Sequence, residues 1–99
     1  MTDADFQRDL CVAADHPSLP GHFPAMPVVP GVVLLEHVAQ ALREWRGLRL
    51  TRVLEAKFVA PLLPDEPARL DLIEAAGRVR FEIRRDGALL ARGLIEGAS

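Results

Sequence analysis

The fold is decided by residues 21–40, which read GHFPAMPVVPGVVLLEHVAQ. The first half contains three prolines, spaced three residues apart from Pro24 to Pro30. Each proline lacks a backbone N–H donor and fixes φ, so this half is predicted to be a rigid, largely extended loop. From Gly31 to about Trp45 the apolar residues have helical spacing and good helix formers dominate. The stretch therefore predicts a stiff loop that leads directly into a helix.

Two residues of this stretch can carry chemistry, His22 in the loop and Glu36 in the helix. Residues 32–35 are all apolar and cover every side of the first helical turn, which predicts that this end of the helix is buried all round. A buried carboxylate is costly unless it is paired or protonated. The first turn also leaves backbone N–H groups free, and their partial positive charge suits a polarised carbonyl oxygen. A base, a potential acid and hydrogen-bond donors thus fall within one short segment.

The same spacing also allows a purely structural role for Glu36. Gln40 follows it by one helical turn and Arg43 by two, so either residue could hold the carboxylate without any catalysis. The other two histidines are predicted to be structural. His16 precedes a proline and is expected in an exposed loop, and His37 lies about 100° around the helix from Glu36 and is expected to be packed or hydrogen-bonded.

Composition indicates one small globular domain, residues 1–99. The apolar fraction of 49% and the charged fraction of 26% are ordinary for a soluble protein, and a net charge of −2 gives no reason to expect a nucleic-acid partner. With Cys11 as the one cysteine, neither an intramolecular disulfide nor a cysteine-based metal motif can form, and we expect a buried or half-buried structural thiol. The sequence contains no long apolar run and no signal-peptide pattern, which predicts a cytoplasmic protein without a membrane partner.

The remaining sequence predicts strands. Alternation in residues 78–84 places Val79, Phe81 and Ile83 on one face, and Asp86-Gly87 is a strong hairpin signal. The predicted strands are residues 6–14, 48–60, 68–76, 78–84 and 88–95, followed by a tail. The order is one strand, the loop, a buried helix that Gly47 ends, and a meander of four strands. Because an apolar helix needs a sheet wrapped around it, the fold class is α+β, with an antiparallel sheet around one central helix.

Residues 21–40 resemble the active-site signature of the 3-hydroxyacyl-(acyl-carrier-protein) dehydratases of fatty acid synthesis. That signature is GHFPxxPVxPG followed by a helix that carries Glu or Asp and then Ala-Gln, and the chain separation of His22 and Glu36 is the family's own. Lys57-Phe58 and the prolines of residues 61–64 also resemble the family, so the resemblance covers about residues 10–96.

The chain departs from the family pattern at three points. Ala25 stands where the family usually has Gly, and Asp65-Glu66 stands where it usually has Gly-Asp. The chain is also shorter than the housekeeping enzymes. Its length is similar to that of the compact dehydratase-like proteins of aryl polyene and related pigment clusters.

The resemblance implies the hot-dog fold and a specific reaction, the removal of water from a (3R)-3-hydroxyacyl thioester to give the trans-2-enoyl thioester. His22 would take the C2 proton and Glu36 would protonate the leaving 3-hydroxyl. N–H groups at Gly31 and Val32 would hydrogen-bond the thioester carbonyl, and Phe23 and Gln40 would contact the substrate. These roles need a neutral His22 and a protonated Glu36, and burial would move both pKa values in the required directions.

The resemblance also implies partners. The acyl chain would arrive on the phosphopantetheine of an acyl carrier protein, with no metal and no further cofactor in the enzyme. The basic residues that could meet this acidic carrier are Arg43, Arg46, Arg49 and Arg52, although an ordinary solvated face explains them equally well. The family places the histidine and the acid on different subunits, so a homodimer, or an assembly built from dimers, is expected.

Two other functions fit the same sequence. A hot-dog thioesterase would use a carboxylate to activate water against the thioester carbonyl, and His22 would then have no clear task. A non-catalytic dehydratase-like subunit would bind an acyl carrier protein or support a catalytic partner. The short chain makes this third function credible.

Overall fold

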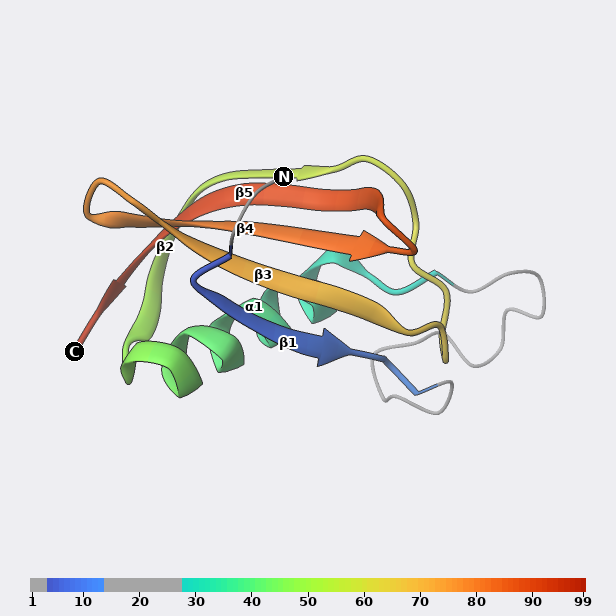
Figure 1. Cartoon of the computed structure of the whole chain (residues 1–99), viewed down its shortest axis with the longest axis horizontal. Coiled ribbons are helices and arrows are strands. Elements are labelled where there is room, and N and C mark those ends of the chain that lie inside the picture. Colours follow the sequence, from blue (N-terminus) through green and yellow to red (C-terminus); the bar gives the residue numbers. More distant parts are fainter. Residues whose placement is uncertain (1–3, 14–27) are drawn as a thin grey trace.

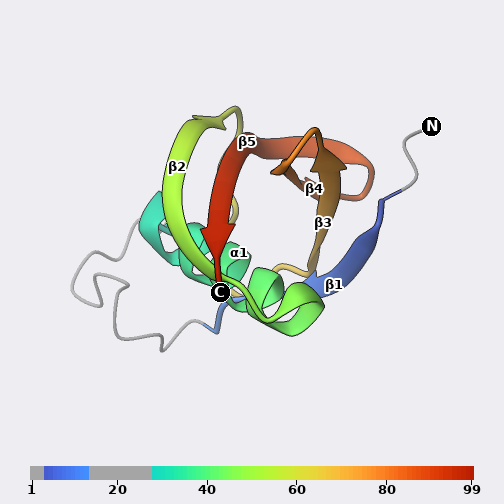
Figure 2. The ribbon, with the colours of Figure 1, turned by 90° about the vertical axis from the view of Figure 1, so that its left-hand side faces the viewer.

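The computed structural model describes residues 4–13 and 28–99. These residues form one helix and a single five-stranded antiparallel sheet with the strand order β1-β3-β4-β5-β2. The elements are β1 (Phe6–Leu10), α1 (Gly31–Arg46), β2 (Arg49–Phe58), β3 (Ala68–Ala75), β4 (Arg78–Arg85) and β5 (Ala88–Ala98). The sheet curves around α1, which lies across its concave side (Figures 1 and 2). The predicted α+β class is confirmed.

Helix α1 begins and ends where the sequence predicts. Pro30 precedes it with φ −61° and ψ 147°, an extended conformation that the proline ring favours. Gly47 ends it with φ 66°, and the Gly47 N–H donates to the Arg43 carbonyl at 2.8 Å. This left-handed cap satisfies one of the carbonyls that every helix C-terminus leaves free, and glycine adopts it without steric cost.

The helix buries one face only. Its buried residues point toward the sheet and are Val33, Leu34, Val38, Ala41 and Leu42. The prediction that its first turns are buried all round is wrong for the described chain, since Val32 is 61% exposed and Glu36 is exposed. The physical reason is that one curved sheet covers only one side of a helix. Apolar residues on another side stay exposed and can contact a different partner.

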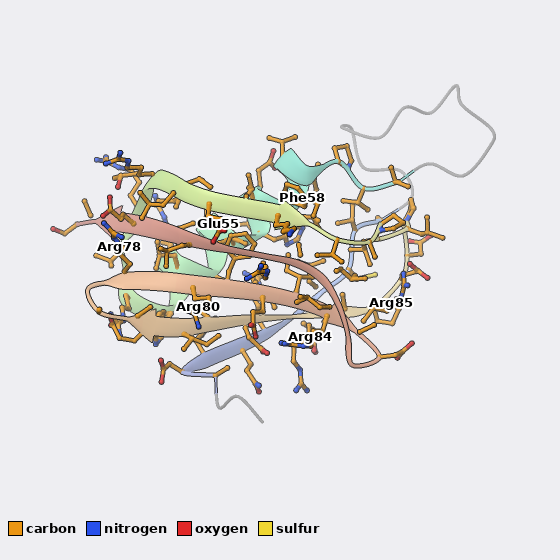
Figure 3. All side chains as sticks on the ribbon, turned by 90° about the horizontal axis from the view of Figure 1, so that it is seen from above. Glu55, Phe58, Arg78, Arg80, Arg84 and Arg85 are labelled. Atoms are coloured by element: carbon orange, nitrogen blue, oxygen red, sulfur yellow. The ribbon has the colours of Figure 1, made fainter. Side chains whose placement is uncertain are left out.

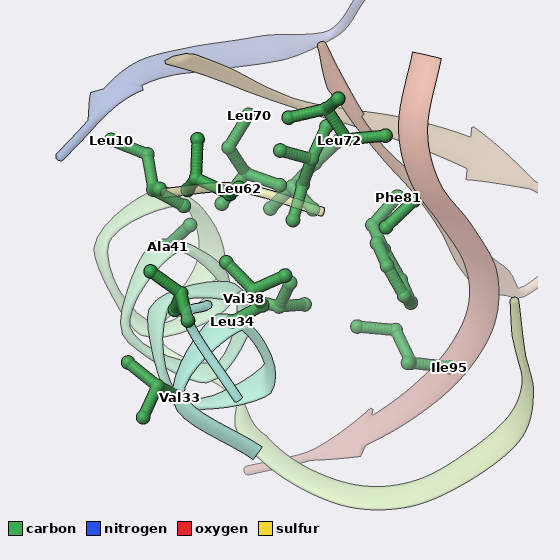
Figure 4. Close-up of a cluster of buried hydrophobic side chains, with 14 of the residues drawn as sticks. Leu10, Val33, Leu34, Val38, Ala41, Leu62, Leu70, Leu72, Phe81 and Ile95 are labelled. Carbon is green, nitrogen blue, oxygen red and sulfur yellow. The ribbon is translucent and has the colours of Figure 1, made fainter. Parts of the chain in front are cut away.

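The core lies between this helix face and the concave side of the sheet (Figure 4). Phe81 is its largest fully buried side chain. Around Phe81 pack leucines and other aliphatic residues of the strands, including Leu70, Leu72 and Ile95. Buried residues from outside the helix and strands, Leu62 among them, close the core at one end.

The predicted meander of four strands is wrong for β2. Strands β3, β4 and β5 follow one another as hairpins, but β2 pairs with β5 and forms an edge of the sheet. The connection of residues 59–67 holds three prolines and crosses the end of the sheet, which a tight hairpin could not do. The predicted tail is also wrong, because β5 continues to Ala98, where it pairs with Arg49 at the start of β2.

Two further observations complete the fold. Cys11 is exposed, so the predicted burial of this thiol is wrong; it follows the last residue of β1, Leu10, on the side away from the core. Within residues 4–13 and 28–99, no helix has the length and apolar character needed to cross a membrane.

Candidate active site

The start of helix α1 has hydrogen-bond donors that the described residues leave unused. The N–H groups of Val33 and Leu34 donate to the Pro30 carbonyl at 3.0 and 3.3 Å. The N–H groups of Gly31 and Val32 find no acceptor among the described residues, since the carbonyls four residues earlier lie outside the helix. Pro30 provides no side-chain cap. These two donors, at the positive end of the helix dipole, can bind an oxygen that becomes more negative during a reaction.

An apolar hollow lies beside these donors. The Phe58 ring packs against Gly31 so closely that a Cβ atom on Gly31 would lie 2.8 Å from the ring Cζ, which explains the glycine at this position. The hollow has a volume of about 260 Å³, and its walls include Val28, Val59 and Leu34. Phe58 is 48% exposed although it is large and apolar. This hollow can accept an apolar chain next to the free N–H groups.

Glu36 lies one helical turn beyond Val32. It belongs to an exposed stripe along α1 formed by Val32, Glu36, Gln40 and Arg43. The stripe faces the β2 side of the molecule, because Gln40 and Arg43 share a hollow with Arg49 and Leu50. Among residues 4–13 and 28–99, none forms a hydrogen bond or ion pair with Glu36. The structural alternative, in which Gln40 or Arg43 holds the Glu36 carboxylate, is therefore wrong within the described chain.

The histidine of the predicted pair cannot be placed. His22, Phe23 and His16 fall in residues 14–27, outside the described residues, and their roles stay predictions. On each side of that segment, the second described residue is buried. Val12 before it and Val29 after it both belong to the hydrophobic core.

Both flanks of this segment bind to one connection, the proline corner, which we define as residues 61–66. The Val12 carbonyl accepts the Asp65 N–H at 2.7 Å, and the Val29 N–H donates to the Leu62 carbonyl at 2.8 Å. Asp65 has φ 65°. Asp is one of the few residues that tolerate this left-handed conformation, which explains how the corner forms with Asp65 at the position where the sequence departs from the pattern that it resembles.

Glu66 closes the proline corner, and sequence reasoning missed this role. Its Oε1 accepts the Leu63 N–H at 2.9 Å and Arg85 Nη1 at 2.7 Å. The Leu63 N–H holds the pKa of Glu66 below its usual range; desolvation opposes this shift, and the Arg85 guanidinium adds to it. Pro61 and Pro64 signalled a corner in the sequence, but nothing there connected it to Arg85, at the end of β4.

The predicted basic cluster does not act as one patch. Arg46 forms an ion pair with Glu74 and lies over the Trp45 ring, 3.9 Å from its centroid. Arg52 lies opposite Glu96 of β5 in the sheet. Only Arg43 and Arg49 line a common hollow, of about 380 Å³, and no described acid pairs with either.

Comparison with known proteins identifies the family. The model of the ApeI-like family, described as ApeI dehydratase, matches residues 1–94. The 3-hydroxyacyl-[acyl-carrier-protein] dehydratase FabZ of Methylobacterium radiotolerans is 32% identical over 85% of this chain and 64% of that protein. FabZ of Haemophilus influenzae is 34% identical over 62% and 48%. The chain belongs to the ApeI-like and FabZ-like dehydratase family, and it spans less than two thirds of the length of these curated relatives.

Solved structures confirm the hot-dog fold. An uncharacterized protein from Erwinia carotovora subsp. atroseptica aligns with a TM-score of 0.78 and 27% identity, covering 93% of this chain and 81% of that one. The dehydratase heterocomplex ApeI:P from Xenorhabdus doucetiae aligns with a TM-score of 0.75 and 22% identity, covering 94% and 86%. Slr0204, a 1,4-dihydroxy-2-naphthoyl-CoA thioesterase from Synechocystis, aligns over 91% and 77% with a TM-score of 0.66 and 19% identity, so the fold alone does not separate dehydratases from thioesterases.

The lowered pKa of Glu66 predicts an acid-sensitive corner. Because the folded-state pKa lies below the unfolded-state value, the ionised Glu66 stabilises the fold above the unfolded-state pKa, and this contribution is lost as the pH falls through the folded-state pKa. Urea unfolding of the wild type and of Glu66→Gln should therefore differ at pH 7 and converge as the pH falls below about 4. A difference that stays constant from pH 7 to pH 3 would contradict this account.

Proposed function

We propose that this chain dehydrates a 3-hydroxyacyl thioester carried by an acyl carrier protein. The proposal rests on one arrangement in a member of the dehydratase family. The N–H groups of Gly31 and Val32, which have no acceptor among the described residues, lie beside an apolar hollow, and Glu36 lies one helical turn beyond Val32. In such a substrate, the thioester carbonyl requires hydrogen-bond donors and the acyl chain requires an apolar site. The 3-hydroxyl requires an acid that protonates it as it leaves.

In the proposed mechanism, the thioester carbonyl accepts hydrogen bonds from Gly31 and Val32. The His22 imidazole removes a proton from C2, and negative charge develops on the carbonyl oxygen, where the two N–H groups stabilise it. Protonated Glu36 donates its proton to the 3-hydroxyl, which leaves as water while the C2–C3 double bond forms. Proton exchange with solvent returns the proton from His22 to Glu36.

A second copy of the chain would complete this site. Large apolar residues are exposed in and just after β2 and near the start of α1. They are Val28, Val32, Val53, Phe58 and Val59. Strand β2 is an edge strand with most of its residues exposed, and its outer backbone groups can pair with another strand. We infer a homodimer in which two β2 strands meet, covering the Glu36 stripe and giving the carboxylate the apolar surroundings that an acid needs.

The family also supports a proposal for the substrate and its delivery. Arg43 and Arg49, free of described acidic partners, offer cations to an acidic carrier next to the Glu36 stripe. The acyl group would be a fatty acid or aryl polyene intermediate, and the reaction would take place in the cytoplasm. One observation favours a second candidate: the structurally similar ApeI:P of Xenorhabdus doucetiae is a dehydratase heterocomplex. A non-catalytic subunit that covers a partner's site would present the same exposed face.

Substitution of the proposed acid and base tests the reaction. With a 3-hydroxyacyl carrier protein as substrate, mass spectrometry should show the loss of one water by the wild type. His22→Ala and Glu36→Gln should each lower kcat/KM by at least about 100-fold, and the wild-type pH profile should be bell-shaped because it needs a neutral base and a protonated acid. Glu44→Gln is the control, since this exposed residue of α1 lies two helical turns from Glu36 and forms an ion pair with Arg8 of β1.

Three results would contradict the proposed reaction. Release of a free acid would identify a thioesterase. An unmodified substrate with a folded wild-type protein would favour the non-catalytic subunit. Full activity in Glu36→Gln would remove the proposed acid from the mechanism.

Light scattering tests the second copy. We expect the wild type at micromolar concentration to have twice the 10.9 kDa mass of one chain. Val53→Lys should shift the mass toward a single chain, because a lysine on the β2 edge is a common device against edge-to-edge pairing. Leu94→Lys, on the neighbouring strand β5 in the interior of the sheet, is the matched control and should keep the wild-type mass. A wild type that remains a single chain would rule out the homodimer.

A further inference from the structure

Phe58 is the last residue of β2, and it lies close to the start of α1 (Figure 3). Its large apolar side chain is 48% exposed and does not belong to the hydrophobic core. A Cβ atom on Gly31 would lie 2.8, 3.0 and 3.2 Å from three carbons of the Phe58 ring. Gly31 is not among the glycines with positive φ, so its backbone conformation does not require glycine. The space above Gly31 is therefore taken up by the Phe58 ring.

This ring also forms part of the wall of the apolar hollow, whose volume is about 260 Å³. Gly31 and Leu34 of α1 line the same hollow, and Val59 continues its wall just after β2. Because the Gly31 N–H has no acceptor among the described residues, a thioester carbonyl can bind there. The acyl carbons that follow this carbonyl would then lie in the hollow, next to the Phe58 ring.

We propose that Phe58 is a specificity-determining residue, whose ring limits the size of the acyl group that the hollow accepts. This inference rests on the proposed dehydratase function. Each methylene that moves from water into an apolar site strengthens binding by about fourfold while room remains. Once the acyl chain reaches a fixed wall, this gain ends, and a misfit of one methylene changes kcat/KM by about 10- to 200-fold. The position of the ring therefore sets the preferred chain length.

The chain provides a matched control on the same strand. Val53 of β2 is also an exposed apolar residue, at 41%, and it does not line the hollow. Val53→Ala removes apolar atoms from the same edge strand and leaves the hollow unchanged. Phe58→Trp is a second variant of the ring, which enlarges it and keeps an apolar side chain on the exposed side of β2.

The experiment compares Phe58→Ala, Phe58→Trp and Val53→Ala with the wild type. We measure kcat/KM for 3-hydroxyacyl carrier proteins from butyryl to dodecanoyl, and Kd for the saturated acyl carrier proteins, which have no 3-hydroxyl and cannot be dehydrated. The ratio of kcat/KM for the longest to the shortest chain should rise at least about tenfold in Phe58→Ala and fall in Phe58→Trp. The ratio of the Kd values should favour the same chains. Val53→Ala should keep both wild-type ratios.

A pair of substitutions tests the contact between the ring and the helix. Gly31→Ala should change the chain-length preference in Kd, because the added methyl group displaces the Phe58 ring. In the double variant with Phe58→Ala, the preference should be that of Phe58→Ala alone, since the displaced ring is no longer present. Independent effects of the two substitutions would contradict the proposed role of this contact.

Unchanged ratios in both Phe58→Ala and Phe58→Trp would overturn the proposal. The same change of ratio in Val53→Ala would also overturn it, because the effect would then come from a general change in β2. A wild type without dehydratase activity would refute the proposed function itself. The Kd values of the saturated acyl carrier proteins would still decide whether Phe58 limits the acyl group, and a Kd that does not depend on chain length would contradict this role.

Discussion

The structure depends on the way helix α1 is covered on one face only. A sheet of five strands curves around the helix and buries the side that carries Val38 and Leu42. It leaves the stripe from Val32 to Arg43 open to solvent, with Glu36 in the middle. The free N–H groups, the apolar hollow and the carboxylate all lie at the border between the covered and the open sides. The proposed reaction would therefore take place where the sheet of the single chain no longer covers the helix.

The same constraint explains the exposed edge strand. Strand β2 follows the helix after only two residues, and all of its residues except Leu50 and Leu54 are exposed. A chain of 99 residues buries a modest core, so a second copy that covers β2 and the stripe would increase the apolar area removed from water. Burial of Glu36 by that copy would also raise the cost of ionising it, which links assembly to the proposed role as an acid.

The sequence predicted the local structure well because local chemistry determines it. Pro30 and Gly47 mark the limits of the helix, and Asp86-Gly87 marks the β4–β5 hairpin. The burial of Glu36 was predicted wrongly, because an apolar turn does not reveal whether its own chain or a second copy covers it. The pairing of β2 with β5 was missed for a related reason, since non-local pairing leaves no signal in strand periodicity.

The candidate site could be predicted only in part. The family motif pointed to the residues at the start of the helix. The structure adds that the Gly31 N–H has no acceptor among the described residues and that the Phe58 ring packs against Gly31. The Glu66–Arg85 ion pair could not be read from the sequence, because Glu66 lies in the connection between β2 and β3, Arg85 ends β4, and no fixed spacing links them. Asp65 looked like a departure from the family pattern, whereas its left-handed φ keeps the backbone that glycine usually provides there.

The resemblance to the family implies that the proposed homodimer pairs Glu36 of one copy with His22 of the other, and subunit complementation tests this arrangement most directly. His22→Ala and Glu36→Gln chains, each inactive alone, are mixed in equal amounts under conditions that exchange subunits, and dehydration is then measured. If the site is shared, half of the dimers are mixed and each has one intact site, so activity should return to about one quarter of the wild-type value. Activity that stays at the level of the separate variants, with mixed dimers demonstrated by native mass spectrometry, would contradict the account.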